Sequence, residues 1–333
     1  MPGADNTLTV MMTKEQIDNL ARRVICEKKG ISRQEAESLL EADLDLLCDG
    51  ADMICRALQP SKVDSCSIVN ARSGMCGEDC KWCAQSRHYS TGCSQYEFLP
   101  YADTLSAARH NEREGIARFS LVTSGRSLPE SSLDVFCDQY RNLAKDTDLY
   151  LCASMGLLSR PQMEKLKNAG VKRYHCNMET SRKQFARLCT THTPDDKLAT
   201  LRYARELGME ICSGGIIGMG ESDADRLDFA FELRELNPDS VPINVLNPIP
   251  GTPLESTPLI SEEDIVRTAA IFRFILPLQS IRFAGGRMRL SHESMVRMMR
   301  GGVNGVLMGD MLTTVSNTIA DDRRLFAEAG WEF

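Results

Sequence analysis

The sequence predicts an α/β protein with a complete (βα)8 TIM-type barrel that follows a set of N-terminal helices. Short β-rich runs recur along the chain at 66–70, 118–123, 149–154, 173–177, 210–217, 240–247, 280–284 and 305–308. Segments with helical periodicity separate these runs, and such alternation is typical of a parallel sheet. In a barrel of this kind the active site lies at the carboxyl ends of the strands.

The N-terminal helices are predicted from two capping boxes, which begin at Thr13 and Ser32 and satisfy free N–H groups at a helix start. We expect residues 1–60 to form a helical extension and residues 61–333 to form the barrel. The helices between strands are expected at 104–114, 133–143, 160–169, 194–207, 224–236 and 262–274. An open doubly wound sheet is the alternative, because pattern reading can miscount strands.

Composition limits the classes of function. The chain has 333 residues, 42% of them hydrophobic, and a net charge of -7, which argues against nucleic acid or an anionic membrane as the main partner. No secretory signal or membrane-spanning run is evident, so we expect a cytoplasmic protein without a membrane partner. Thirteen cysteines are many for that compartment. Reducing conditions disfavour disulfides, so some of these cysteines are expected to ligate metal.

Cys76, Cys80 and Cys83 lie in one short loop directly after the first predicted strand. Three thiolates from one loop ligate three irons of a 4Fe–4S cluster and leave the fourth iron open to a substrate. A structural zinc knuckle with His88 as fourth ligand is the alternative. Zinc knuckles usually pair C-x2-C units, and here only Cys80 and Cys83 have that spacing. The loop therefore predicts a catalytic iron–sulfur site on the active face.

Further segments, read together with this loop, resemble the biotin synthase family of the radical S-adenosylmethionine superfamily. They lie in order at 66–86, 174–181, 189–193, 212–221, 241–253, 281–287 and 312–314. The resemblance covers roughly residues 60–330, and several motifs in one order make coincidence implausible. It implies a (βα)8 barrel and a homodimer. It also implies insertion of sulfur between two unactivated carbons of dethiobiotin, which forms the thiophane ring of biotin.

The resemblance also implies a cofactor and a set of site residues. Removing hydrogen from a saturated carbon requires a radical, which S-adenosylmethionine supplies when the reduced 4Fe–4S cluster cleaves it. The implied S-adenosylmethionine-binding residues are Trp82, Asn177, Glu179, Lys197 and Ile216. The implied dethiobiotin-binding residues are His175, Asn177, Asn244, Thr313 and Thr314. Lys197 lies where the family often carries an arginine, so the positive charge is kept but the planar guanidinium with its paired donors is lost.

One departure from the family pattern concerns the auxiliary cluster. The usual biotin synthase ligates a 2Fe–2S cluster through cysteines on the second, third and fifth strands and an arginine on the seventh. Cys152, Cys212 and Arg282 match three of these positions, but the second strand carries Ser120, a poor replacement for a thiolate. Cys66 is present on the first strand instead. Because alternate strands of a barrel fill one interior layer, these three cysteines and Arg282 are expected to share a layer.

This pattern resembles a variant biotin synthase of anaerobes, in which the auxiliary cluster is larger and carries an extra sulfide. We therefore expect iron-bound sulfide, rather than a dismantled 2Fe–2S cluster, to be the sulfur source, with Arg282 among the catalytic residues. Family resemblance implies reduced ferredoxin or flavodoxin as electron donor. The enzymatic alternative is sulfur insertion into an octanoyl chain, as in some lipoyl synthases. From another class, a cysteine-rich electron-transfer module needs neither an eight-strand barrel nor an open iron.

Overall fold

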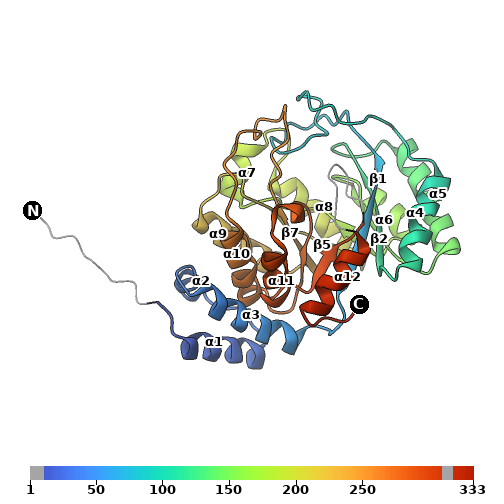
Figure 1. The fold of residues 1–333 in the computed structure, drawn as a ribbon. Coiled ribbons are helices and arrows are strands. Elements are labelled where there is room, and N and C mark those ends of the chain that lie inside the picture. The colour runs from blue at the N-terminus through green and yellow to red at the C-terminus, as the bar shows by residue number, and fades with distance from the viewer. Residues whose placement is uncertain (1–10, 310–317) are drawn as a thin grey trace, which may run out of the picture.

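The computed structural model describes residues 11–309 and 318–333 (Figure 1). Three helices come before the first strand: α1 (Lys14–Glu27), α2 (Arg33–Leu39) and α3 (Leu44–Leu58). Thr13 and Ser32 form the predicted capping boxes of α1 and α2, with the partner side chain reaching back in each case. The apolar faces of these helices are buried, with Ile17 and Ile54 fully inaccessible to solvent. The expectation of N-terminal helices is thus confirmed.

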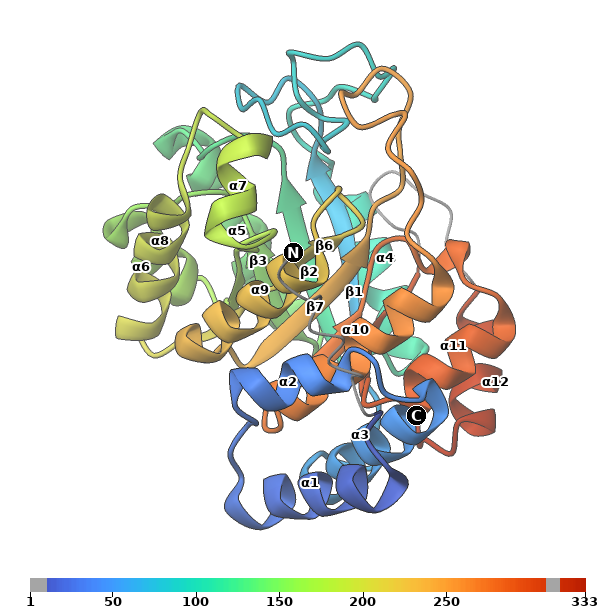
Figure 2. The same ribbon diagram turned by 90° about the vertical axis from the view of Figure 1, so that its left-hand side faces the viewer.

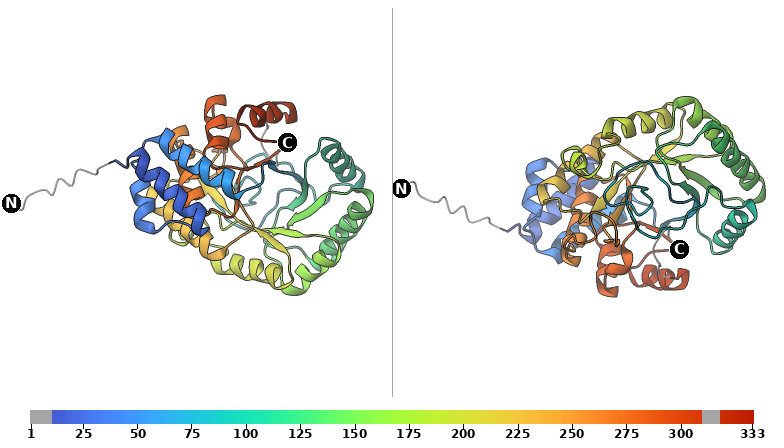
Figure 3. Two further views of the ribbon diagram at one scale, coloured as in Figure 1. Left: turned by 90° about the horizontal axis from the view of Figure 1, so that it is seen from below. Right: turned by 90° about the horizontal axis from the view of Figure 1, so that it is seen from above.

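The remaining elements alternate as predicted. The strands are β1 (Asp64–Arg72), β2 (Arg118–Thr123), β3 (Tyr150–Ser154), β4 (Arg173–His175), β5 (Glu210–Cys212), β6 (Gly215–Ile217), β7 (Ser240–Val245), β8 (Ser280–Phe283) and β9 (Gly305–Leu307). The helices after β1 are α4 (Tyr101–Arg113), α5 (Glu130–Asp146), α6 (Arg160–Asn168), α7 (Arg182–Leu188), α8 (Pro194–Glu206), α9 (Asp223–Leu236), α10 (Glu262–Ile275), α11 (His292–Arg300) and α12 (Ile319–Glu328), with a 3₁₀ turn at Arg287–Arg289. Helices surround the strands when the molecule is viewed from above or below (Figure 3).

The strands form a closed, wholly parallel barrel. Their order is β5-β4-β3-β2-β1-β9-β8-β7-β6, and β5 also pairs with β7 through Cys212 and Ser240. β5 and β6 follow one another along the same barrel position, so the ring has eight positions. The prediction of a complete (βα)8 barrel is therefore confirmed, and the open-sheet alternative is wrong.

Side chains on each strand alternate between the helices and the barrel interior. On β2, Phe119 and Leu121 belong to the apolar core that also contains Phe136 and Tyr140 of α5. Ser120, between them, is fully buried but lies on the other face of the strand. The carboxyl ends of the strands point toward the end where the long loops lie, and α1, α2 and α3 lie at the opposite end (Figure 2).

The predicted strand at 210–217 is divided, because Ser213 and Gly214 leave the ladder between β5 and β6. Gly214 explains the break. Its backbone lies so close to β7 that a Cβ atom there would be 2.0 Å from the carbonyl oxygen of Pro242. Only glycine permits this approach of two backbones. Gly214 therefore meets a packing requirement between two strands of the barrel.

Replacing Gly214 with alanine is expected to destabilise the fold by about 1–3 kcal/mol, because the added methyl group must displace β7. The free energy of unfolding in urea measures the effect. Gly77→Ala is the matched control, since a Cβ at Gly77 would approach nothing closer than 3.8 Å. Equal stability of the two variants would contradict the packing explanation.

No helix within the described ranges has the length and apolar character needed to cross a bilayer.

Candidate active site

The cysteine loop begins at the carboxyl end of β1 and is folded by its own backbone. The amide of Cys76 donates to the carbonyl of Gln85 at 3.0 Å, and the carbonyl of Cys76 accepts from Arg87 at 2.8 Å. The amide of Cys83 donates to Cys80 at 3.0 Å. All three thiols are free. This chain segment therefore presents three thiols from one compact loop above the barrel, which is a donor set that suits an iron–sulfur cluster.

A second loop, residues 189–193, holds the cysteine loop in place. The carboxylate of Asp79 accepts from the amide of Thr190 at 2.8 Å and from the amide and hydroxyl of Thr191 at 3.2 and 3.1 Å. The amide of Lys81 donates to Leu188 at 3.0 Å. Partial burial favours the neutral acid, but the hydrogen bonds from Thr190 outweigh it and lower the pKa of Asp79. The Cys-Thr-Thr-His-Thr motif thus has a structural role that its sequence did not reveal.

Cys189 lies beside the cysteine loop. Its sulfur is 3.6 Å from the sulfur of Cys80 and 3.3 Å from Nδ1 of His192, which is also 2.6 Å from a carboxylate oxygen of Glu78. Cys80, Cys189 and His192 are close enough to hold a metal ion together. Cys189 lies more than a hundred positions from Cys80 along the chain, so only folding brings the two together.

The structure gives no support to His88 as a zinc ligand. Its side chain is exposed, and its Nε2 is 2.9 Å from the carbonyl oxygen of Gly77. Within the described residues, His88 is not part of a group whose ligand atoms converge on one point. The zinc-knuckle alternative is therefore set aside.

A cavity of about 260 Å³ lies beneath the cysteine loop, at the carboxyl ends of the strands. Its walls come from the cysteine loop, from β6 and β7 and from the segments that follow β4, β7 and β8. The residues that bear on function are Trp82, Cys83, Asn177, Glu179, Ile216 and Asn244. Trp82 and Ile216 form its apolar side together with Leu246, and Trp82 packs edge-on against Phe185 at 6.2 Å. The cavity thus combines an apolar wall with an amide and a carboxylate.

The polar side of this cavity follows β4. The side-chain oxygen of Asn177 accepts from the amide of Gly214 at 3.2 Å. Glu179 has a φ of 74°, which is unusual for a residue with a side chain, and its backbone pairs with Gly215. Burial raises the pKa of Glu179, although the ammonium of Lys197 opposes it. Lys197 is buried, and its ammonium donates to the backbone oxygen of Asn177 at 2.8 Å.

The residues expected to bind dethiobiotin occupy different positions. Asn244 bridges two neighbours, donating to Gly215 at 3.0 Å and accepting from the amide of Gly285 at 2.8 Å, which leaves one N–H and one lone pair of its amide for a ligand. His175 points into the barrel below the cavity. Burial, and then the charge of Arg282, lower its pKa to about 3, so its imidazole is neutral at physiological pH. Thr313 and Thr314 lie outside the described residues.

The expected auxiliary ligands lie in one layer of the barrel, as the strand register shows. Cys66 is opposite Arg118 on β2, and the residue two positions further along β2 is opposite Cys152. An advance of two residues along β4 leads in the same way from Cys152 to Cys212. Two residues along β7 lead from Cys212 to Arg282, and two along β9 lead from Arg282 back to Cys66. Four advances of two residues give eight in all, which is the shear of a (βα)8 barrel. These four side chains therefore encircle the barrel axis at one height.

The thiols of this layer are isolated from water. Cys66 and Cys152 are fully buried, and Cys212 is 2% exposed. Burial raises the pKa of all three thiols, although neighbouring arginines oppose it at each. Burial alone therefore keeps these sulfurs protonated, and a metal centre is what would convert them to thiolates.

Unpaired polar atoms surround the same layer. Arg118, Arg173, Ser240 and Gly305 form the layer beneath it, and Ser120, His175, Pro242 and Leu307 form the layer above it, by the same register. Within the part of the chain that the structure describes, five buried atoms here have no hydrogen-bond partner: Arg282 Nε, Arg173 Nη1, Ser240 Oγ, Ser120 Oγ and His175 Nε2. Each such atom costs about 1–3 kcal/mol. A polar group between the thiols, such as an iron–sulfur cluster, fits this environment.

Asp64 forms the floor beneath the thiols and was missed by sequence reasoning. Its Oδ1 accepts from Arg118 at 2.8 Å, while its Oδ2 accepts from Arg282 at 2.7 Å and from Ser280 at 2.9 Å. Arg173 approaches the same oxygen at 3.9 Å. Burial raises the pKa of Asp64, but the three arginines, Arg282 first, outweigh it and lower the value to about 2. The orientation of Arg282 is thus fixed from below.

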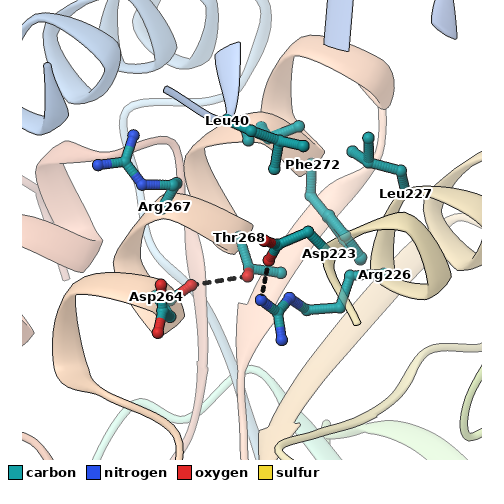
Figure 4. Close-up of a pocket in the computed structure, with 9 residues that line it drawn as sticks. Leu40, Asp223, Arg226, Leu227, Asp264, Arg267, Thr268 and Phe272 are labelled. Atoms are coloured by element: carbon teal, nitrogen blue, oxygen red, sulfur yellow. Dashed lines mark hydrogen bonds and ion pairs between the residues drawn. The ribbon is translucent and has the colours of Figure 1, made fainter. Parts of the chain in front are cut away.

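A second, much smaller hollow lies outside the barrel, between α2, α9 and α10 (Figure 4). Its polar side chains are already paired: Arg226 with Asp223, and the hydroxyl of Thr268 with the carbonyl of Asp264 at 2.6 Å. It has room for about one water molecule. Its position and size do not suit an active site.

Two family models match the chain. The Radical SAM superfamily model matches residues 72–233, and the Biotin and Thiamin Synthesis associated domain matches residues 242–332. Among solved structures, methylornithine synthase (PylB) covers 92% of this chain and 95% of its own at a TM-score of 0.79 and 18% identity. HydG, a maturase of the [FeFe]-hydrogenase, covers 97% of this chain and 76% of its own at a TM-score of 0.81 and 16% identity. These two structures share the fold.

Curated relatives are much closer in sequence. Biotin synthase of Clostridium botulinum is 46% identical over 302 residues, which is 91% of this chain and 95% of that protein. Biotin synthase of Porphyromonas gingivalis is 47% identical over 291 residues, 87% of this chain and 88% of that protein. Biotin synthase of Acetivibrio thermocellus is 50% identical over 283 residues, 85% of this chain and 88% of that protein. This chain therefore belongs to the biotin synthase family.

Proposed function

We propose that this protein converts dethiobiotin to biotin by radical-mediated insertion of sulfur. The observation that carries the proposal is the presence of two sets of thiols along one barrel axis. Cys76, Cys80 and Cys83 lie above the strand ends, and the layer of Cys66 and Cys152 lies deep in the interior. Cys83 of the first set lines the cavity at the strand ends, and Asn244, which also lines it, lies two residues beyond Pro242 of the layer above the second set. This arrangement suits a substrate that loses a hydrogen atom to a radical on one side and accepts a sulfur atom from the other.

When bound, the first cluster supplies the electron that cleaves S-adenosylmethionine into methionine and a 5′-deoxyadenosyl radical, and the auxiliary cluster supplies sulfur. The protein holds and orients the reactants. Trp82 and Ile216 offer an apolar wall for the adenine, and Asn177 offers its free amide hydrogens to a carboxylate or hydroxyl. Lys197 acts by fixing the backbone of Asn177, since its ammonium already binds that carbonyl.

Glu179→Gln is expected to raise the KM for S-adenosylmethionine by about tenfold or more, because a charged acceptor for the cofactor is lost. The rate of 5′-deoxyadenosine release at varied cofactor concentration measures the change. Glu164→Gln, on the exposed face of α6, is the control and should behave as the parent. An unchanged KM in Glu179→Gln would exclude the proposed contact.

For dethiobiotin, the roles proposed are contact of the ring with Asn244 and His175 and binding of the tail carboxylate by Thr313 or Thr314. The remaining N–H and lone pair of Asn244 match the donor and acceptor of a urea-like ring. The neutral imidazole of His175 can face an uncharged ring without burying a charge.

The auxiliary cluster is proposed to be larger than 2Fe–2S and to carry an additional sulfide. Ser120 lies above the layer rather than in it, and its unpaired hydroxyl is a weaker ligand for iron than a thiolate. The three thiolates of the layer and Arg282 remain as the ligand set. Arg282 is held by Asp64 at 2.7 Å, and its unpaired Nε is available to the cluster.

The direct test is anaerobic incubation of the reconstituted protein with dithionite, S-adenosylmethionine and dethiobiotin. Biotin and 5′-deoxyadenosine are the expected products. The protein should contain about eight irons per chain, and its acid-labile sulfide should exceed its iron. About six irons per chain would count against the larger auxiliary cluster. An octanoyl peptide in place of dethiobiotin tests the lipoyl-type alternative, and its thiolation without biotin formation would overturn the proposal. Reduced ferredoxin or flavodoxin as donor, and a homodimer, are proposed on the family resemblance.

A further inference from the structure

Arg173 is an arginine of the barrel interior that has no role in the reaction proposed above. It lies on β4 directly opposite Cys152, in the layer immediately beneath the thiols. Its side chain is 4% exposed. Two of its nitrogens, Nε and Nη2, bind one carboxylate oxygen of Glu210 at 2.7 and 2.5 Å. This fork fixes the plane of the guanidinium.

The third nitrogen, Nη1, is the one left over. It has no hydrogen-bond partner among the described residues, and the nearest acid oxygen, on Asp64, is 3.9 Å away. That oxygen already accepts from Arg282 and Ser280. Arg173 is opposite Cys152 in the pairing of β3 with β4, and the residue two positions after it is opposite Cys212 in the pairing of β4 with β5. Its strand therefore lies between the two strands that carry these thiols.

The charges beneath the thiol layer also favour a negatively charged group at that height. Three guanidiniums, those of Arg118, Arg173 and Arg282, meet two carboxylates, those of Asp64 and Glu210. Among residues 11–309 and 318–333, one positive charge of this group is thus left without an acid partner. A group that carries negative charge and several acceptor sulfurs, at the height of the thiols, would satisfy both the charge and the free N–H groups.

We propose that Arg173 is a positioning residue for the auxiliary cluster, which donates hydrogen bonds from Nη1 to its sulfur atoms on the side away from the substrate. This inference rests on the proposed function. Arg282 and Arg173 then contact the cluster differently: Arg282 lies within the thiol layer, and Arg173 supports it from beneath. The anchor for Arg173 is Glu210, just as the anchor for Arg282 is Asp64.

Arg118 provides a matched control. It lies in the same layer as Arg173, on β2 at the opposite side of β3, and also pairs with an acid, Asp64, at 2.8 Å. Its guanidinium stacks over the ring of Tyr150 at 4.6 Å, and its side chain is 21% exposed. None of its nitrogens is a buried atom without a partner. Replacing Arg118 therefore removes the same charge from the same layer without removing a donor to the cluster.

The experiment compares Arg173→Gln and Arg118→Gln in the full chain, reconstituted anaerobically. Total iron and sulfide are measured, and 5′-deoxyadenosine release verifies that the first cluster is intact in each. Arg173→Gln is expected to retain its auxiliary iron about tenfold more weakly against a chelator, whereas Arg118→Gln, which removes the charge but no donor to the cluster, should weaken retention much less. Equal retention in the two variants overturns the inference and leaves the proposed function standing. A parent without auxiliary iron overturns both.

If Arg173→Gln does not fold, Arg173→Lys decides the question. Lysine keeps the charge, but its single ammonium cannot hold Glu210 and reach the sulfurs together. The absorption and paramagnetic resonance spectra of the auxiliary cluster are expected to change in Arg173→Lys and to remain as in the parent in Arg118→Lys. A purely structural role for Arg173 would leave these spectra unchanged, and that result would overturn the inference.

Discussion

Cys66→Ala is expected to lower biotin formation by about a hundredfold or more while 5′-deoxyadenosine is still released. Cys66 is fully buried on β1 and shares a layer with Cys152 and Cys212. Removing one of three thiolates should prevent the auxiliary cluster from assembling or from staying bound. The first cluster should survive, because its ligands lie in a different segment, above the strand ends. Product analysis by mass spectrometry, together with iron and sulfide content, measures both effects.

The matched control for Cys66→Ala is Cys137→Ala. Cys137 is 1% exposed on α5 and packs in the apolar core outside the barrel, so its loss removes a buried thiol without touching the layer. This variant should make biotin and hold iron as the parent does. Normal biotin formation by Cys66→Ala would show that the layer is not the sulfur site.

Asp64→Asn is expected to destabilise the fold by about 3–5 kcal/mol at neutral pH, because Arg118 and the buried Arg173 and Arg282 lose their shared carboxylate. The carboxylate binds Arg118 and Arg282 directly and is 13% exposed. The free energy of unfolding in urea, measured on cluster-free protein, isolates this effect from loss of the metal centre. Asp138→Asn removes an exposed surface partner of Arg141 and should change stability little.

The same carboxylate gives a defined dependence on pH. The pKa of Asp64 is lowered from 3.8 to about 2 in the folded protein, so the unfolded chain binds a proton more readily than the folded chain. Its contribution, about 2 kcal/mol, is complete above about pH 4 and is lost as the pH falls toward about 2. The stability difference between the parent and Asp64→Asn should therefore be constant at neutral pH and shrink below about pH 4. A difference that stays constant to about pH 3 would contradict this assignment.

Much of the fold follows from local patterns. The capping boxes at Thr13 and Ser32 and the alternation of strands with helices were readable because each depends on residues close together in the chain. The fifth strand was predicted as one run, since its apolar periodicity continues from β5 into β6. The break depends on how near the backbone of Gly214 comes to Pro242, and no local pattern reports that distance.

The candidate site also contains residues that local patterns predict and residues that only folding brings together. Spacing within one loop identified Cys76, Cys80 and Cys83, and alternation of strands identified the layer of Cys66 and Arg282. The partners of these residues were not identified. Asp79 binds a loop more than a hundred residues away, and nothing in its own neighbourhood marks it as a ligand for that loop. Roles for Thr313 and Thr314 rest on resemblance alone, since both lie outside the described residues.

The sequence by itself determined the barrel and the family and predicted the iron–sulfur loop, because these depend on periodicity, on the order of motifs and on the spacing of cysteines. Only the tertiary structure decided what surrounds the deep thiols. Asp64, Arg173 and Glu210 are ordinary charged residues at the starts of strands when read along the chain. Closing the barrel with a shear of eight brings them beneath one layer of cysteine sulfurs. Because solvent access is low there, the interactions of each charge are strengthened and each unpaired N–H costs free energy.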